Sequence, residues 1–109
     1  MIIVTLRHLA EAMKTYPDAA AEIKAWVALS KTARWENLVE VRSLFKDADG
    51  VDGYVVFNIR RNRYRLITVI HYSKELGNRC TEGHIYIRSF LTHSEYDNRG
   101  NWDRKYGTQ

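Results

Sequence analysis

A histidine and a tyrosine three residues apart are the first candidates for chemistry in this 109-residue chain. His93 and Tyr96 lie in segment 92–97, where a helical turn would place them on one face. Imidazole exchanges protons near neutral pH, so the pair could supply a proton acceptor and a proton donor. The segment also fits a simple helix cap, with Thr92 and Glu95 as a capping box and both rings in ordinary surface or packing roles. The residues alone leave both interpretations open.

Three polar side chains are predicted to share one face of a β-sheet. Residues 54–59 and 64–72 are rich in β-branched and aromatic side chains and predict a hairpin in which Asn58 faces Arg65. Arg88, in a later strand, has the parity to point the same way. Two arginines on an open face could hold a phosphate through paired hydrogen bonds. The alternative is a solvated face on which the arginines bond to local carboxylates.

Further arginines surround the expected tip of this hairpin. If Arg61 and Asn62 form a two-residue turn, Arg60 and Arg63 flank it and Tyr64 follows directly. Guanidinium groups at a tip can bind a nucleic-acid backbone, and the tyrosine could add a stacking surface for a base. An ordinary charged turn explains the same residues equally well.

Composition limits the kinds of site that the chain can form. Lys and Arg number 17 against 13 Asp and Glu, which gives a net charge of +4 and favours an anionic partner. Cys80 is the only cysteine, so the chain can form neither an intramolecular disulfide nor a thiolate zinc cage. His8, His71 and His84 show no metal-ligand spacing. We therefore expect no metal and no other cofactor.

The elements that must position these residues follow from hydrophobic periodicity. A β-branched start at residues 2–4 predicts a strand, and Thr5 is expected to cap a helix that ends before a proline. A second helix then forms an antiparallel hairpin with the first, and Asn37 precedes a third, short helix. Residues 73–83 are expected to be a polar loop that leads into a last strand over 84–91.

Together these elements predict an α+β domain. An N-terminal strand and a helical hairpin pack on one face of a small, twisted, mainly antiparallel β-sheet, and a short helix follows the last strand. Residues 1–98 form this single domain, and residues 99–109 form a polar C-terminal tail in which Trp102 is either disordered or a docking anchor. The apolar start is far shorter than a signal-peptide core or a membrane span, so we expect a cytoplasmic protein without a membrane partner.

Four segments occur in a specific order along the chain: 54–59 (YVVFNI), 62–66 (NRYRL), 85–88 (IYIR) and 92–97 (THSEYD). Together they resemble the HigB-like toxin family of the RelE superfamily. The turn at 16–18 and Trp26 also resemble the helical hairpin of that family, so the resemblance covers residues 1–98. The expected loop at 73–83 is longer than the short turn usual in the family.

This resemblance implies a toxin of a type II toxin-antitoxin system. Such a toxin is a metal-independent endoribonuclease that cleaves messenger RNA on the ribosome and thereby inhibits translation. The 2′-hydroxyl attacks the adjacent phosphate, which leaves a 2′,3′-cyclic phosphate or its opened form and a 5′-hydroxyl. The implied partners are messenger RNA, the ribosome and a cognate antitoxin, a helix-turn-helix DNA-binding protein.

The resemblance also assigns roles to the candidate residues. Arg65 and Arg88 would hold the scissile phosphate and stabilise its added charge. His93 would move a proton, with Tyr96 as its partner or as a stacking surface for a base. Asn58 would position RNA or hold Arg65, and the residues of the hairpin tip would bind RNA.

Two other functions use the same basic surface. A non-catalytic RNA-binding or ribosome-binding module needs no proton-transfer groups, and an interaction domain could present its positive face to an acidic partner. A cleavage assay separates both from an endoribonuclease, because only the enzyme creates new 5′ ends.

Overall fold

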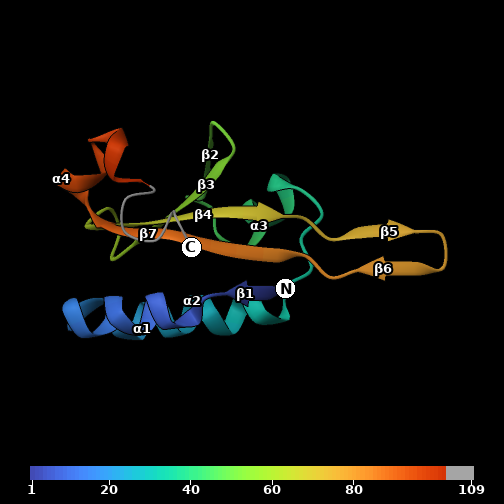
Figure 1. The fold of residues 1–109 in the computed structure, drawn as a ribbon, viewed down its shortest axis with the longest axis horizontal. Helices are drawn as coiled ribbons and strands as arrows, with labels where there is room; N and C mark the ends of the chain where they lie inside the picture. Colours follow the sequence, from blue (N-terminus) through green and yellow to red (C-terminus); the bar gives the residue numbers. More distant parts are fainter. Residues whose placement is uncertain (103–109) are drawn as a thin grey trace.

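The computed structural model describes residues 1–102 and gives them an α+β fold built on a mixed five-stranded sheet. Its strands lie in the order β1, β7, β4, β3, β2 (Figure 1). β1 runs parallel to β7, and the other neighbours are antiparallel. The predicted α+β class is confirmed. The strands of this main sheet are β1 (Ile2–Val4), β2 (Asp49–Val51), β3 (Tyr54–Ile59), β4 (Tyr64–His71) and β7 (His84–Thr92).

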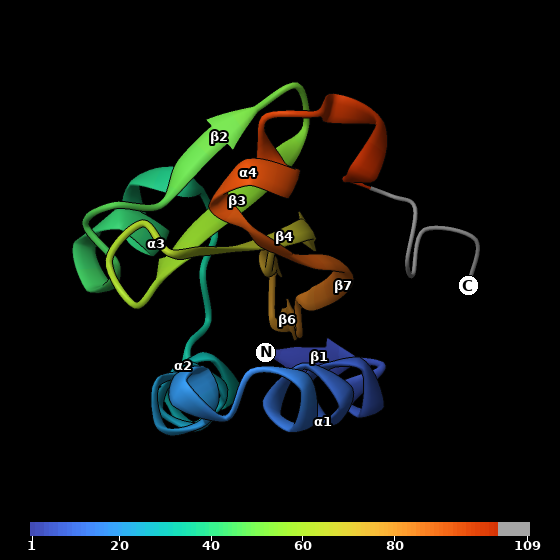
Figure 2. The same cartoon turned by 90° about the vertical axis from the view of Figure 1, so that its left-hand side faces the viewer.

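Helices α1 and α2, over residues 6–15 and 20–32, form an antiparallel hairpin against one face of the main sheet (Figure 2). The larger core fills the space between them, where Ile23 and Trp26 are buried. Trp26 packs edge-on against Phe57 with ring centroids 5.3 Å apart. The helical elements are α1 (Leu6–Thr15), the 3₁₀ turn η1 (Pro17–Ala19), α2 (Ala20–Thr32), α3 (Leu38–Leu44), α4 (His93–Tyr96) and the 3₁₀ turn η2 (Arg99–Asn101).

The local sequence explains where these helices begin, with an exception at α1. Asn37 caps α3 by accepting the Glu40 amide at 3.0 Å, and Pro17 opens the turn that leads into α2. Thr5 makes no side-chain cap bond, and its φ of 68° is a left-handed angle. The prediction of a Thr5 cap is therefore wrong, because Thr5 forms the sharp corner between β1 and α1.

Strands β3 and β4 pair in the register that the sequence predicts, with Asn58 opposite Arg65. The connection contains residues 60–63, in which the Arg63 amide donates to the Arg60 carbonyl at 3.1 Å. Arg60 and Arg61 both adopt left-handed backbone angles, with φ of 55° and 62°. The connecting hydrogen bond keeps the register of the predicted tight turn, even though the bulky arginines occupy strained angles.

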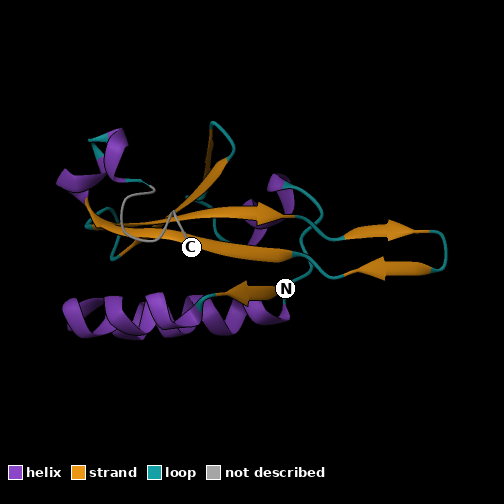
Figure 3. Ribbon diagram, in the orientation of Figure 1, coloured by secondary structure: helices purple, strands orange, loops and turns teal. Residues whose placement is uncertain are grey.

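The structure contains two hairpins that were not predicted from the sequence. Asp52 and Gly53 both have positive φ and connect β2 to β3, which is the sequence pair typical of a tight hairpin. The expected loop at 73–83 instead forms a hairpin of β5 (Lys74–Leu76) and β6 (Arg79–Thr81), which projects beyond the main sheet (Figure 3). These strands are short and polar, so they lack the apolar alternation by which strands are recognised.

Residues 99–102, predicted to be part of a polar tail, pack against the sheet. Trp102 is 5% exposed and lies in a second core cluster with Val56, Ile67 and Leu91. Its indole nitrogen donates to the carbonyl oxygen of Tyr96 at 2.9 Å. Of the two alternatives for Trp102, the docking anchor is correct. Residues 103–109 of the predicted tail lie outside the described residues.

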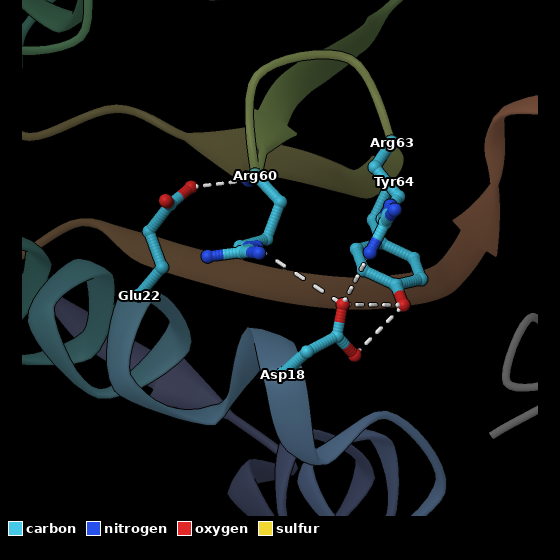
Figure 4. Close-up of polar contacts among 5 residues, drawn as sticks. All are labelled: Asp18, Glu22, Arg60, Arg63 and Tyr64. Atoms are coloured by element: carbon cyan, nitrogen blue, oxygen red, sulfur yellow. Dashed lines mark hydrogen bonds and ion pairs between the residues drawn. The ribbon is translucent and has the colours of Figure 1, made fainter.

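A carboxylate of the helical layer holds the β3–β4 connection (Figure 4). The oxygens of Asp18 accept from the Tyr64 hydroxyl at 2.9 and 3.0 Å and from Arg63 at 3.1 Å. Glu22 accepts the backbone amide of Arg60 at 2.5 Å. The Tyr64 hydrogen bond is the largest cause that lowers the pKa of Asp18, and burial raises the pKa of Tyr64 so that its hydroxyl remains a donor.

We expect Asp18→Asn to destabilise the fold at neutral pH and to flatten its dependence on acid. A carboxylate with a lowered folded-state pKa contributes stability above its unfolded pKa, near 4, and loses that contribution as pH falls through the folded value. Urea-unfolding midpoints measured from about pH 7 to about pH 2 should show the gap between parent and variant closing in acid. Asp47→Asn is the matched control, since Asp47 makes no ion pair within residues 1–102. A gap that stays constant over this pH range would contradict the role given to Asp18.

We expect Trp102→Ala to destabilise the domain by about 3–5 kcal/mol, because it removes a buried ring from the second cluster. Trp102→Phe keeps a ring but loses the bond to Tyr96, which costs about 1 kcal/mol. Urea unfolding measures both values. If Trp102→Ala unfolded at the same urea concentration as the parent, the C-terminal segment would not be part of the cooperative fold.

Candidate functional site

The face of the main sheet opposite the helical hairpin carries the candidate site, and we call it the open face. Asn58 and Arg65 point to it, because their strand neighbours Phe57 and Leu66 lie in the larger core on the other side. Strands β1, β3, β4 and β7 contain two arginines and two histidines but no acidic residue, and the edge strand β2 contains Asp49, which pairs with Arg42 at 3.4 Å. This composition suits an anionic ligand.

Carbonyl groups and an aromatic ring fix Arg65 at one end of the open face. Its Nη1 donates to the carbonyl oxygens of Asn62 at 2.8 Å and Tyr64 at 3.5 Å. Its guanidinium lies over the Tyr96 ring, 5.1 Å from the ring centroid. Arg65 has no carboxylate partner within residues 1–102. The alternative of local ion pairing therefore does not apply to Arg65.

The Tyr96 ring is held between neighbours of two kinds. Arg65 lies over it, and Trp102 stacks on it with ring centroids 4.8 Å apart and an interplanar angle of 15°. Arg99 lies in turn over the Trp102 ring, 4.4 Å from its centroid. Because its ring is already engaged, Tyr96 is better suited to act through its hydroxyl than to stack on a base.

The capping interpretation of segment 92–97 is confirmed. Thr92 and Glu95 bond reciprocally, with Thr92 accepting the Glu95 amide at 3.3 Å and Glu95 accepting the Thr92 amide at 3.0 Å. The exposed His93 starts the helical turn, and its amide donates to the Arg63 carbonyl at 2.9 Å. The cap does not use the side chains of His93 and Tyr96. Capping and chemistry are thus compatible in this segment.

Arg88 occupies an irregular position in β7. Ile67 pairs with Ser89 and Thr68 pairs with Ile87, so Arg88 is an extra residue of β7 that the pairing register with β4 skips. A bulge of this kind bends the strand and re-aims a side chain, and bulges are common beside active sites. The alternation of side chains along a strand predicted that Arg88 lies on the same face as Arg65. It did not predict the bulge.

The arginines at the hairpin tip are partly neutralised. Arg63 pairs with Asp18 at 3.1 Å, and Arg60 lies 4.0 Å from the same carboxylate. Arg61 is exposed and forms no ion pair within residues 1–102. Tyr64 is only 6% exposed, with its ring packed against Tyr16 and Phe90 in the core. The predicted stacking of an RNA base on Tyr64 is therefore wrong.

Residues 1–102 lack two other features, a metal-binding cluster and a membrane-spanning helix. No three or more His, Cys, Asp or Glu residues gather there in a way that could hold a metal ion. In the same residues, no helix has the length and apolar character needed to cross a membrane. Cys80 is exposed on the projecting β5–β6 hairpin.

The structure adds two contributors to the site that the sequence did not reveal. Asp18 holds the hairpin tip, although its sequence position suggested only a favourable charge near the start of a helix. Trp102 holds the ring of Tyr96 from the C-terminal segment. Both contacts join segments far apart in the chain, which no local pattern encodes.

Comparisons of the sequence with known proteins identify its family. Residues 19–99 match the HigB_toxin family model, described as the RelE-like toxic component of a toxin-antitoxin system. The chain is 25% identical over 100 residues to the mRNA interferase toxin HigB of Escherichia coli (strain K12), covering 89% of this chain and 88% of that protein. The mRNA interferase HigB of Shigella flexneri matches to the same extent. The family match spans most of the chain, and the chain therefore belongs to the HigB family of RelE-like toxins.

Proposed function

We propose that this toxin is an endoribonuclease that cleaves messenger RNA at the end of the open face where β4 meets α4. The observation that carries the proposal is the environment of Arg65. Carbonyl oxygens and the Tyr96 ring hold its guanidinium in place, and no carboxylate within residues 1–102 neutralises it. A positioned cation of this kind is suited to a phosphate whose charge grows during reaction.

The proposed reaction is a transfer within the RNA strand that uses no metal. His93 takes the proton of a 2′-hydroxyl, and the 2′-oxygen forms a bond to the adjacent phosphorus. The bond from phosphorus to the 5′-oxygen breaks, and Tyr96 gives that oxygen a proton. Arg65 and Arg88 stabilise the added negative charge. The products are a 2′,3′-cyclic phosphate and a 5′-hydroxyl.

The remaining predicted residues take supporting roles in this proposal. Asn58, beside Arg65 in the register, positions the RNA strand. Arg61 contacts the backbone, and Arg60 and Arg63 add a weaker positive field because Asp18 compensates part of their charge. Tyr64 takes no part in binding RNA.

The proposed setting is the cytoplasm, with the ribosome presenting the messenger RNA. Cleavage there inhibits translation. A cognate antitoxin with a helix-turn-helix DNA-binding domain would control the toxin. Support comes from the toxin family and from the relatives named mRNA interferase.

We expect Arg65→Ala to slow cleavage by about 100- to 1,000-fold, because one positioned charge is lost from the transition state. Arg65→Lys should recover part of this loss, since it keeps the charge but not the planar guanidinium. The measurement is the rate at which new 5′-hydroxyl ends form on a translated messenger RNA. Arg34→Ala, which removes an exposed arginine outside the open face, serves as the control. Parental rates in both Arg65 variants would exclude this phosphate site.

We expect His93→Ala and Tyr96→Phe each to slow cleavage by about 100-fold or more, without large changes in RNA affinity. Tyr96→Phe removes only the hydroxyl, so it leaves the ring between Arg65 and Trp102. Growth after induction, with and without the adjacent antitoxin gene, gives a second measurement. A folded double variant of Arg65→Ala and His93→Ala that still cut RNA at the parental rate would disprove the assignment. RNA protection without new 5′ ends would identify a non-catalytic binding module instead.

A further inference from the structure

Three aromatic side chains gather on the open face at the end of β4 and β7 that is remote from α4. His71 and His84 are direct partners in the register, so both point to the same side. Tyr86 contacts both rings, with centroids 4.9 Å from His71 and 6.2 Å from His84. We call these three residues the aromatic platform.

The platform does not serve the core. Its strand neighbours Ile70 and Ile85 lie in the larger core on the helical side of the sheet. His71 is exposed, while His84 and Tyr86 are half-buried. Aromatic rings that fill no core and remain accessible are suited to bind a flat ligand.

Apolar side chains extend the platform toward β1. Ile2 pairs with His84 in the register and is 45% exposed, and Val4 and Val69 both pair with Tyr86. The patch therefore combines three aromatic rings with an apolar border. It lies on strands that contain no acidic residue.

The platform follows Arg88 along β7, and the cluster of Ile67, Leu91 and Trp102 lies between it and Arg65. Tyr86 and His84 lie two and four residues before Arg88 on β7, so successive open-face positions are about 7 Å apart along the strand. A cation followed by aromatic rings matches an extended single strand of RNA, in which a phosphate is followed by an unpaired base. A protein partner would not require this succession.

We propose that the aromatic platform binds one or two unpaired bases of single-stranded RNA by stacking, beyond Arg88 on the side away from Arg65. The inference rests on the proposed function for its ligand. Stacking on aromatic side chains tolerates any base, because every base has a π-face. The platform thus adds affinity and fixes the strand along β7, whereas Arg65, Arg88, His93 and Tyr96 carry out the reaction.

The test measures binding of a fluorescent single-stranded RNA by anisotropy. Every 2′-hydroxyl of this RNA is methylated, so cleavage is blocked. A second probe of equal length has abasic sugars throughout and keeps every phosphate. Tyr86→Ala should weaken binding of the first probe by about fivefold or more and leave the abasic probe within about twofold, because only the bases stack.

Two further variants separate stacking from damage to the fold. Tyr86→Phe keeps the ring and should bind both probes as the parent does. His71→Ala removes an exposed ring at the end of β4, and it should weaken the base-bearing probe without changing the melting temperature. If either variant weakened the binding of both probes equally, the proposal for the platform would be overturned. It would also be overturned if Tyr86→Ala or His71→Ala left the binding of the base-bearing probe unchanged.

Cleavage assays on the same variants distinguish the two proposals. If the parent cuts RNA and Tyr86→Ala has unchanged affinity and cleavage, the platform is wrong and the endoribonuclease stands. If the parent never cuts RNA but binds it through Tyr86, the platform stands and the endoribonuclease fails. A variant that changes self-association in sedimentation, with unchanged RNA affinity, would show a protein interface and overturn the platform.

Discussion

The central strands β4 and β7 must serve two surfaces at once, and the rest of the structure depends on this constraint. On one side, residues such as Leu66, Ile85 and Phe90 are buried against the helical layer. On the other side, Arg65, Arg88 and Tyr86 occupy positions of the open face. Because side chains alternate along a strand, a shift of one residue would exchange the two sets. Stability of the core and placement of the site are therefore fixed by the same register.

Contacts between distant segments make this arrangement specific. Asp18 ties the helical layer to the β3–β4 connection and so fixes the start of β4. At the same end, the C-terminal segment covers part of the open face and holds Tyr96 through Trp102. The two contacts act on opposite sides of the sheet. Between them they hold Arg65 and α4 in a fixed relative position, which the proposed reaction requires.

The open face is consequently divided along its length. Arg65 lies at the end beside α4, Trp102 covers Ile67 and Leu91 next to it, and Arg88 leads to the aromatic platform at the far end. A surface with separate places for charge and for rings can hold a strand of RNA in one direction. This division gives a physical reason why a small domain of the HigB family could position a phosphate without a deep pocket.

The sequence by itself determined the α+β class, the pairing of Asn58 with Arg65 and the cap at Thr92, because each follows from periodicity or contacts a few residues long. It also indicated the family through short motifs in order. It did not reveal the polar β5–β6 hairpin, and it placed Tyr64 on the surface. Only the tertiary structure decided that Tyr64 is buried, that Asp18 compensates arginines of the hairpin tip, and that Trp102 docks. Those outcomes depend on which distant surfaces meet, and hydrophobic patterning along one strand does not contain that information.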